Sequence, residues 1–201
     1  MRRTARIVGA LFLAGFLSYG VGNLIATGNV RSADGSGSTA LLVTGAALML
    51  LNSAFVIAIG VLMFPILRAH NEPVAAGYLG TRIFEGVVLA IGVVSLIVLS
   101  GSDAIDANAA CYNVAEAGLG IGSLSLCALL FRTGLVPRFL AAWGFIGYAC
   151  FAVGNLLELF GVAGAGLVGA IPGGLFELTF GIWLIARGFA STATVRSRAS
   201  T

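Results

Sequence analysis

The stretch VAAGYLGTRIFEGVVLAIGVVSLIVLS, residues 74–100, is an apolar run interrupted by one arginine and one glutamate. It is longer than the ~20 residues that an α-helix needs to cross a membrane. Arg82 and Glu85 are three positions apart, so their side chains share one face of that helix. A charged group in hydrocarbon is costly unless it finds a partner or water. The stretch therefore predicts a membrane-spanning helix that turns this pair toward other helices.

The composition of the whole chain agrees with a membrane protein. Of its 201 residues, 59% are hydrophobic and 9% are charged, whereas a typical soluble domain has about 25% charged residues. Glycine, with 29 residues, is frequent, which suits closely packed membrane helices. The longest polar stretches, residues 28–39 and 191–201, are too short to bury a core of their own. We therefore expect residues 1–201 to form a single integral membrane domain.

Six apolar runs are long enough to span a bilayer, and they predict an all-α, polytopic bundle of six transmembrane helices. The expected spans are residues 7–27, 40–67, 74–99, 109–131, 139–162 and 164–186. A basic head followed by an apolar run is also typical of a signal peptide. The first run is longer than the apolar part of such peptides, so we expect it to be retained.

The arginines predict how the bundle is oriented. Nine of the 11 arginines flank the side that holds both termini, against Arg31 alone in the opposite loops. Because cytoplasmic loops are enriched in basic residues, both termini are expected in the cytoplasm and the protein in the cell (plasma or inner) membrane, in contact with membrane lipids. The arginines are scattered over span ends instead of forming one basic patch, which argues against nucleic-acid binding.

Three other spans each carry one glutamate, at Glu116, Glu158 and Glu177. A rise of about 1.5 Å per residue places these acids, with Arg82 and Glu85, at successive depths in the bilayer. One guanidinium cannot neutralise four carboxylates. By depth, we expect Arg82 to balance either Glu85 or Glu177. Acids that remain without a counter-ion must be protonated or hydrogen-bonded, as in a proton relay.

Polar neighbours accompany two of these acids. Asn113 precedes Glu116 by three residues, and Asn155 precedes Glu158 by the same spacing. Each amide is therefore expected to donate a hydrogen bond to its glutamate and to lower the cost of burial. Tyr78, from the same stretch as Arg82, completes the set. The candidate proton or ligand site consists of Tyr78, Arg82, Glu85, Asn113, Glu116, Asn155, Glu158 and Glu177.

The sequence argues against an enzyme. His70, the single histidine, lies in a short linker, so neither Ser–His chemistry nor the Glu-x-x-His pattern of di-iron bundles is expected. The three cysteines show no CxxC spacing, which argues against a zinc site and a disulfide framework. We therefore expect no catalytic residues, no metal and no cofactor.

Two functions remain open at this stage. In the first, protonatable glutamates drive proton-coupled transport of a small cationic or lipophilic compound, so that protons and a small-molecule substrate are the partners. In the second, the polar cluster only holds the bundle together, and the protein is a non-catalytic membrane partner, a sensor or a lipid-binding subunit.

Three groups of residues resemble a known family. These are Arg82-x-x-Glu85, the turn RTGLVPRFL at residues 132–140, and the ending that runs from Pro172 through Glu177 to WLIARG at residues 183–188. They are similar to a bacterial six-span membrane family described as domain of unknown function 4386. The resemblance covers nearly the whole chain and implies the six-span fold, but it implies no reaction. It carries over to Arg82, Glu85, Pro137, Arg138 and Glu177.

Overall fold

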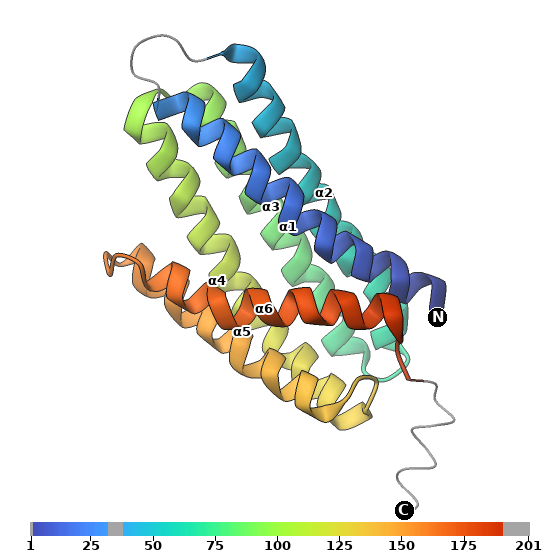
Figure 1. Ribbon diagram of the computed structural model, residues 1–201. Helices are drawn as coiled ribbons and strands as arrows, with labels where there is room; N and C mark the ends of the chain where they lie inside the picture. Colours follow the sequence, from blue (N-terminus) through green and yellow to red (C-terminus); the bar gives the residue numbers. More distant parts are fainter. Residues whose placement is uncertain (1, 32–37, 191–201) are drawn as a thin grey trace, which may run out of the picture.

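The computed structural model describes residues 2–31 and 38–190, which form six α-helices (Figure 1). The helices are α1 (Arg2–Arg31), α2 (Thr39–Arg68), α3 (Glu72–Val98), α4 (Gly101–Thr133), α5 (Arg138–Leu159) and α6 (Ala165–Ala186). Each is long and apolar enough to cross a membrane. The predicted all-α fold of six long apolar helices is confirmed. Residues 32–37, from the predicted loop, and the predicted tail at 191–201 lie outside the described residues.

Two helices extend beyond the spans expected from the apolar runs. Helix α1 continues to Arg31, and α4 begins at Gly101, well before the span expected from residue 109. At α4 the backbone of Ser100 is extended and Asp103 lies in the first helical turn. An acidic side chain there interacts favourably with the helix dipole. Polar residues thus continue the helix beyond its apolar part.

Two of the short connections between helices carry clear signals for a helix end or start. At the start of α3, the Asn71 side chain accepts a hydrogen bond from the Val74 amide at 3.0 Å, and Pro73 occupies the first turn. Gly134 ends α4 in the left-handed conformation, with φ of 65°, which favours glycine. Pro137 then precedes α5. These signals agree with the basic turn expected between the fourth and fifth spans.

The helices form a closed ring. Each helix packs against the next in chain order, α6 packs back against α1, and α1 also contacts α4 across the interior. Figure 1 shows α6 running obliquely across the direction of α2, α3 and α4. This crossing brings the middle of α6 to the polar positions of α3.

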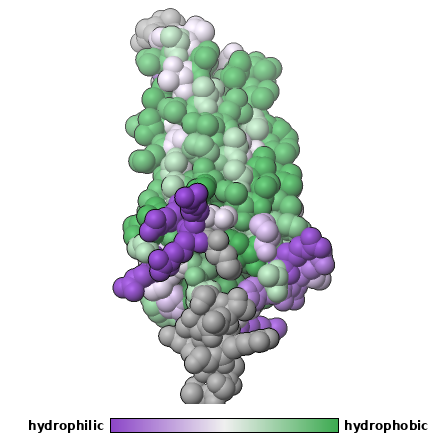
Figure 2. All heavy atoms as spheres, turned by 90° about the vertical axis from the view of Figure 1, so that its right-hand side faces the viewer, coloured by the Kyte–Doolittle hydropathy of each residue, from purple (hydrophilic) through white to green (hydrophobic). Residues whose placement is uncertain are grey.

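The outer surface of the ring is apolar. Large hydrophobic side chains are exposed on all six helices, among them Leu24, Val98 and Leu167. Figure 2 shows hydrophobic residues over most of the height of the molecule and hydrophilic ones gathered at one end. At the end of the bundle where α1 begins and α6 ends, the exposed charged residues are Arg2, Arg3, Arg6, Arg68, Glu72, Arg132, Arg138 and Arg187. A belt of this kind is suited to lipid.

Candidate functional site

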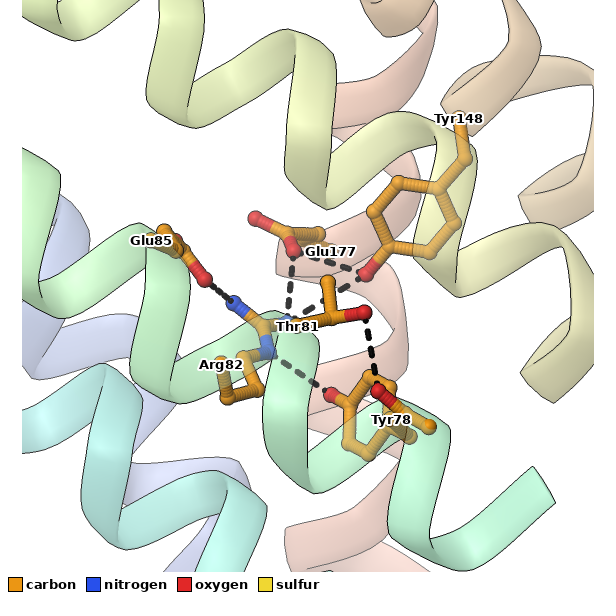
Figure 3. A network of polar contacts seen from close by, with 7 residues as sticks. Tyr78, Thr81, Arg82, Glu85, Tyr148 and Glu177 are labelled. Atoms are coloured by element: carbon orange, nitrogen blue, oxygen red, sulfur yellow. Dashed lines mark hydrogen bonds and ion pairs between the residues drawn. The ribbon is translucent and has the colours of Figure 1, made fainter. Parts of the chain in front are cut away.

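Arg82 is the centre of a buried polar network (Figure 3). Its side chain is only 1% exposed. Within α3, Nε of Arg82 donates to the hydroxyl of Tyr78 at 2.8 Å, and Nη1 donates to Oε2 of Glu85 at 2.9 Å. These residues lie four positions before and three positions after the arginine. The spacing brings all three side chains to the same face of the helix.

The other side of the guanidinium reaches α5 and α6. Nη2 of Arg82 donates to Oε1 of Glu177 at 3.0 Å and to the hydroxyl of Tyr148 at 3.4 Å. The Tyr148 hydroxyl in turn donates to Oε1 of Glu177 at 2.7 Å. From α1, the ring of Phe12 lies 5.0 Å from the guanidinium carbon, within the range of a cation–π contact. One arginine thereby connects four of the six helices.

This geometry answers which acid Arg82 balances. The sequence left Glu85 and Glu177 as alternatives, and the guanidinium forms an ion pair with both. Its planar fork of donors allows this, because each nitrogen points to a different acceptor. Tyr78 and Tyr148 accept one further hydrogen bond each, so four of the five N–H donors of the guanidinium have an acceptor. The arginine is well satisfied, whereas the two carboxylates share a single positive charge.

A pocket of about 260 Å³ opens beside this network. Its polar lining comprises Asn52, Arg82, Glu85, Glu116 and Glu177, and its aromatic lining comprises Phe12, Phe16, Tyr19, Tyr112 and Phe151. The rings of Tyr19 and Tyr112 stack at a centroid distance of 5.3 Å. Pockets of this kind, mostly apolar with a few convergent polar groups, are typical of small-molecule sites.

Glu116 is the acid in this pocket that Arg82 does not hold. It is 7% exposed, and among the described residues it has no hydrogen bond or ion pair. Asn52, 6% exposed, lines the same pocket and is equally without a partner in that part of the chain. Buried polar groups are normally paired. Both side chains are therefore available to a bound molecule or to water.

The prediction that Asn113 and Asn155 each donate a hydrogen bond to the following glutamate is wrong. Nδ2 of Asn155 donates to the carbonyl of Phe151 at 2.8 Å instead of to Glu158. Asn113 forms no bond to Glu116 within the described residues. A short amide side chain readily bonds the carbonyl one turn back on its own helix, which competes with a neighbour one turn ahead. Neither asparagine lines the pocket.

Glu158 lies outside the pocket and has a structural contact. Its Oε2 accepts a hydrogen bond from the backbone amide of Gly166 at 2.9 Å, in the first turn of α6. The first amides of a helix have no partner within the helix, and a carboxylate there also complements the helix dipole. Of the four predicted glutamates, Glu85, Glu116 and Glu177 are brought together and Glu158 is not.

Truncation of Glu158 should therefore affect stability. We expect Glu158→Ala to lower the free energy of unfolding by about 1 kcal/mol, as for the loss of other helix N-terminal caps. Glu158→Gln keeps an acceptor oxygen and should cost less. Thermal unfolding in detergent measures both. An alanine variant as stable as the wild type would show that the bond to Gly166 contributes nothing.

Sequence reasoning missed several residues of the network and the pocket, among them Asn52, Tyr112 and Tyr148. Asn52 is an amide inside an apolar run, but no glutamate follows it by three residues, so the spacing that pointed to Asn113 and Asn155 does not apply to it. Tyr112 and Tyr148 carry no such signal either. Tyrosines in membrane helices are common at interfaces and in packing, and nothing in the local sequence indicates that Tyr148 reaches Glu177.

Six apolar helices closed around a buried arginine–glutamate network define a multi-pass membrane protein. The family model described as domain of unknown function (DUF4386) matches residues 7–188, and the chain belongs to this family. The resemblance noted in the sequence is thus confirmed. No curated protein and no solved structure matches the chain.

Proposed function

We propose that the protein exchanges a small cationic or lipophilic compound for protons across the cell membrane, and that the compound binds in the pocket beside Arg82. The observation that carries this proposal is the position of Glu116. It is a buried acid that lines a pocket and has no partner among the described residues. Intramembrane ionisable groups in such positions commonly belong to substrate or proton pathways.

Charge balance supports exchange. Three acids and one arginine line the pocket, so full ionisation would leave an excess of two negative charges. Such an excess is very unfavourable in a region shielded from water. The empty site is therefore expected to hold about two protons. A bound monovalent cation supplies one of those charges, so its binding should release a proton. Movement of the cation is in this way coupled to movement of protons in the opposite direction.

The orientation follows from the arginines. The end of the bundle where α1 begins and α6 ends carries most of the exposed arginines, and basic residues favour the cytoplasmic side. In our proposal both termini are cytoplasmic. Glu177 and Glu85 then lie near the middle of the membrane, with Glu116 toward the outer side.

The coupling is tested with purified protein in liposomes that contain a pH-sensitive dye. A panel of permanently charged quaternary ammonium ions avoids proton transfer by free amines. Addition of a transported ion should drive proton movement through the wild type, and Glu116→Gln should abolish it. Glu116 is the most informative residue to replace, because its substitution breaks no hydrogen bond or ion pair within the described structure. Proton movement at the wild-type rate in this variant would reject the mechanism.

Glu158→Gln is the matched control for this experiment. It also removes one intramembrane carboxylate, but Glu158 lies outside the pocket and contacts α6. Its flux should equal that of the wild type. Equal loss in both variants would indicate a general effect of removing acids, which would not support a role for the pocket.

A second function is favoured by the completeness of the Arg82 network. All of its bonds lie within the bundle and connect α1, α3, α5 and α6, as expected of an architectural element. In a sensor, partner or lipid-binding protein this network would be purely structural. That alternative predicts no proton movement with any cation, although substitutions at Glu85 or Glu177 would still lower thermal stability.

A further inference from the structure

The pocket opens through the side of the bundle. Of the residues that line it, Phe16 and Gly20 are exposed, and the others are buried or partly buried. Both lie near the middle of α1, four positions apart and therefore on one face of the helix. The opening is thus at mid-height of the helix and not at either end of the bundle.

Helix α1 changes its packing partners along its length, beside the pocket. Near its start it packs closely on α6, since a Cβ on Gly181 would lie 3.1 Å from the carbonyl of Gly9. The rings of Phe12 and Phe180 are 5.7 Å apart. Farther along, α1 instead meets α4 through Tyr19 and its partner ring. In Figure 1, α1 begins beside the end of α6 and ends beside the start of α4.

Phe16 lies across this opening. Its side chain is 37% exposed, and its ring lies 3.6 Å from the position that a Cβ on Gly174 of α6 would occupy. Around the opening, Leu17 on α1 and Ile171 and Leu175 on α6 are exposed. A mouth at mid-helix surrounded by large apolar side chains faces the hydrocarbon of the membrane, not water.

The size of the pocket limits its occupant. A cavity of about 150 Å³ holds one benzene molecule, so about 260 Å³ holds roughly ten non-hydrogen atoms. The five aromatic rings of the lining can contact an aromatic group or a quaternary ammonium group. Glu116 has no counter-ion among the described residues, so it can give up a proton and supply a negative charge to a bound cation. Together these features fit a small organic cation with one ring.

We infer that the pocket binds a one-ring organic monocation that arrives from the lipid through the opening between α1 and α6, with Phe16 as the gate. This inference rests on the proposed function for the use of the pocket in transport. Binding itself does not depend on transport, so the two are tested separately. The charged head contacts Glu116, and the ring lies among the aromatic side chains.

Three probes test the chemistry of the pocket. Phenyltrimethylammonium has about ten non-hydrogen atoms, which matches the volume. The neutral tert-butylbenzene has the same shape without the charge, and tetramethylammonium has the charge without the ring. Calorimetric titration of the full chain in detergent should give the tightest binding for phenyltrimethylammonium. Each of the other two should bind about tenfold more weakly or worse.

The variant Glu116→Gln should lower the affinity for phenyltrimethylammonium by about tenfold and leave that for tert-butylbenzene unchanged. If the glutamine variant does not fold, Glu116→Ala also removes the carboxylate and should lower the affinity for phenyltrimethylammonium by a similar factor. Equal affinities of all three probes for the wild type would overturn the inference. So would absence of binding at tens of millimolar, or an unchanged affinity in Glu116→Gln.

The gate is tested by rates. Exchange broadening of the trimethyl proton signal of phenyltrimethylammonium, with the protein in lipid nanodiscs, gives association and dissociation rates. Phe16→Trp should slow both rates by a similar factor, and Phe16→Ala should speed dissociation. Phe145→Trp changes an exposed phenylalanine outside the pocket and is the control. Unchanged rates in both Phe16 variants would refute the lateral opening.

The outcomes separate the two proposals. Binding of phenyltrimethylammonium that depends on Glu116, without any proton flux in liposomes, would refute transport and keep the assignment of the pocket. Proton flux with another cation, together with no preference for a ring, would refute the substrate class proposed here and keep transport.

Discussion

Replacing Arg82 with methionine is expected to lower the free energy of unfolding by about 3–5 kcal/mol, as when one partner of other buried ion pairs is removed. The loss of stability comes from the buried polar groups that Arg82 leaves without a partner. Glu85 and Glu177 would lose their shared counter-ion inside the bundle, and the hydroxyl of Tyr78 would lose its donor. Methionine fills most of the volume, so the effect reports charge and hydrogen bonding more than an empty cavity.

Thermal unfolding in detergent measures this loss, and two further variants establish its cause. Arg82→Lys keeps the charge but lacks the planar fork that reaches separate acceptors, so its stability should be intermediate. Adding Glu85→Gln and Glu177→Gln to the methionine variant should recover part of the stability, because it removes the uncompensated charges. A triple variant no more stable than Arg82→Met would contradict the electrostatic explanation.

Arg68→Met is the matched control. Arg68 pairs with Glu72 at 3.0 Å, but both side chains are well exposed to solvent. Exposed pairs are worth about 0–1 kcal/mol, so this variant should unfold close to the wild-type temperature. If Arg82→Met were no less stable than Arg68→Met, the buried network would not stabilise the fold.

The helical fold was accessible from the sequence because membranes impose simple rules. An apolar run of sufficient length must be helical, since its backbone has no other hydrogen-bond partners in lipid. That rule found all six helices. It did not find their ends. Helix α1 ends at Arg31 and α4 begins at Gly101, and these terminal turns are polar, so no apolar pattern marks them. Only capping and packing determine where such turns stop.

The site was accessible in part. The spacing of Arg82 and Glu85 is a local property of one helix, and it predicts their ion pair directly. Glu177 could be associated with them by depth alone. Tyr148 could not, because its contact with Glu177 depends on how α5 and α6 pack against each other. Such contacts follow from packing of whole surfaces, which spacing in one helix does not reveal.

Gly120→Ala should also be strongly destabilising. A Cβ at this position in α4 would lie 2.6 Å from the carbonyl oxygen of Tyr148 and 2.6 Å from the amide nitrogen of Ala152 on α5. Both are backbone atoms, so no change of side-chain rotamer can relieve the overlap. The two helices must separate, and overpacking of this kind typically costs about 1–3 kcal/mol.

Gly80→Ala is the matched control, because Gly80 also lies inside a helix but a Cβ there meets nothing within 4 Å. Alanine should stabilise α3 by about 0.5–1 kcal/mol through its higher helix propensity. Thermal unfolding should therefore shift in opposite directions in the two variants. Separation of α4 from α5 would also draw Phe151 on α5 away from Glu116 on α4, and both residues line the pocket. Phenyltrimethylammonium should then bind more weakly to Gly120→Ala and unchanged to Gly80→Ala. Identical unfolding curves would mean that α4 and α5 do not pack as closely as this contact requires.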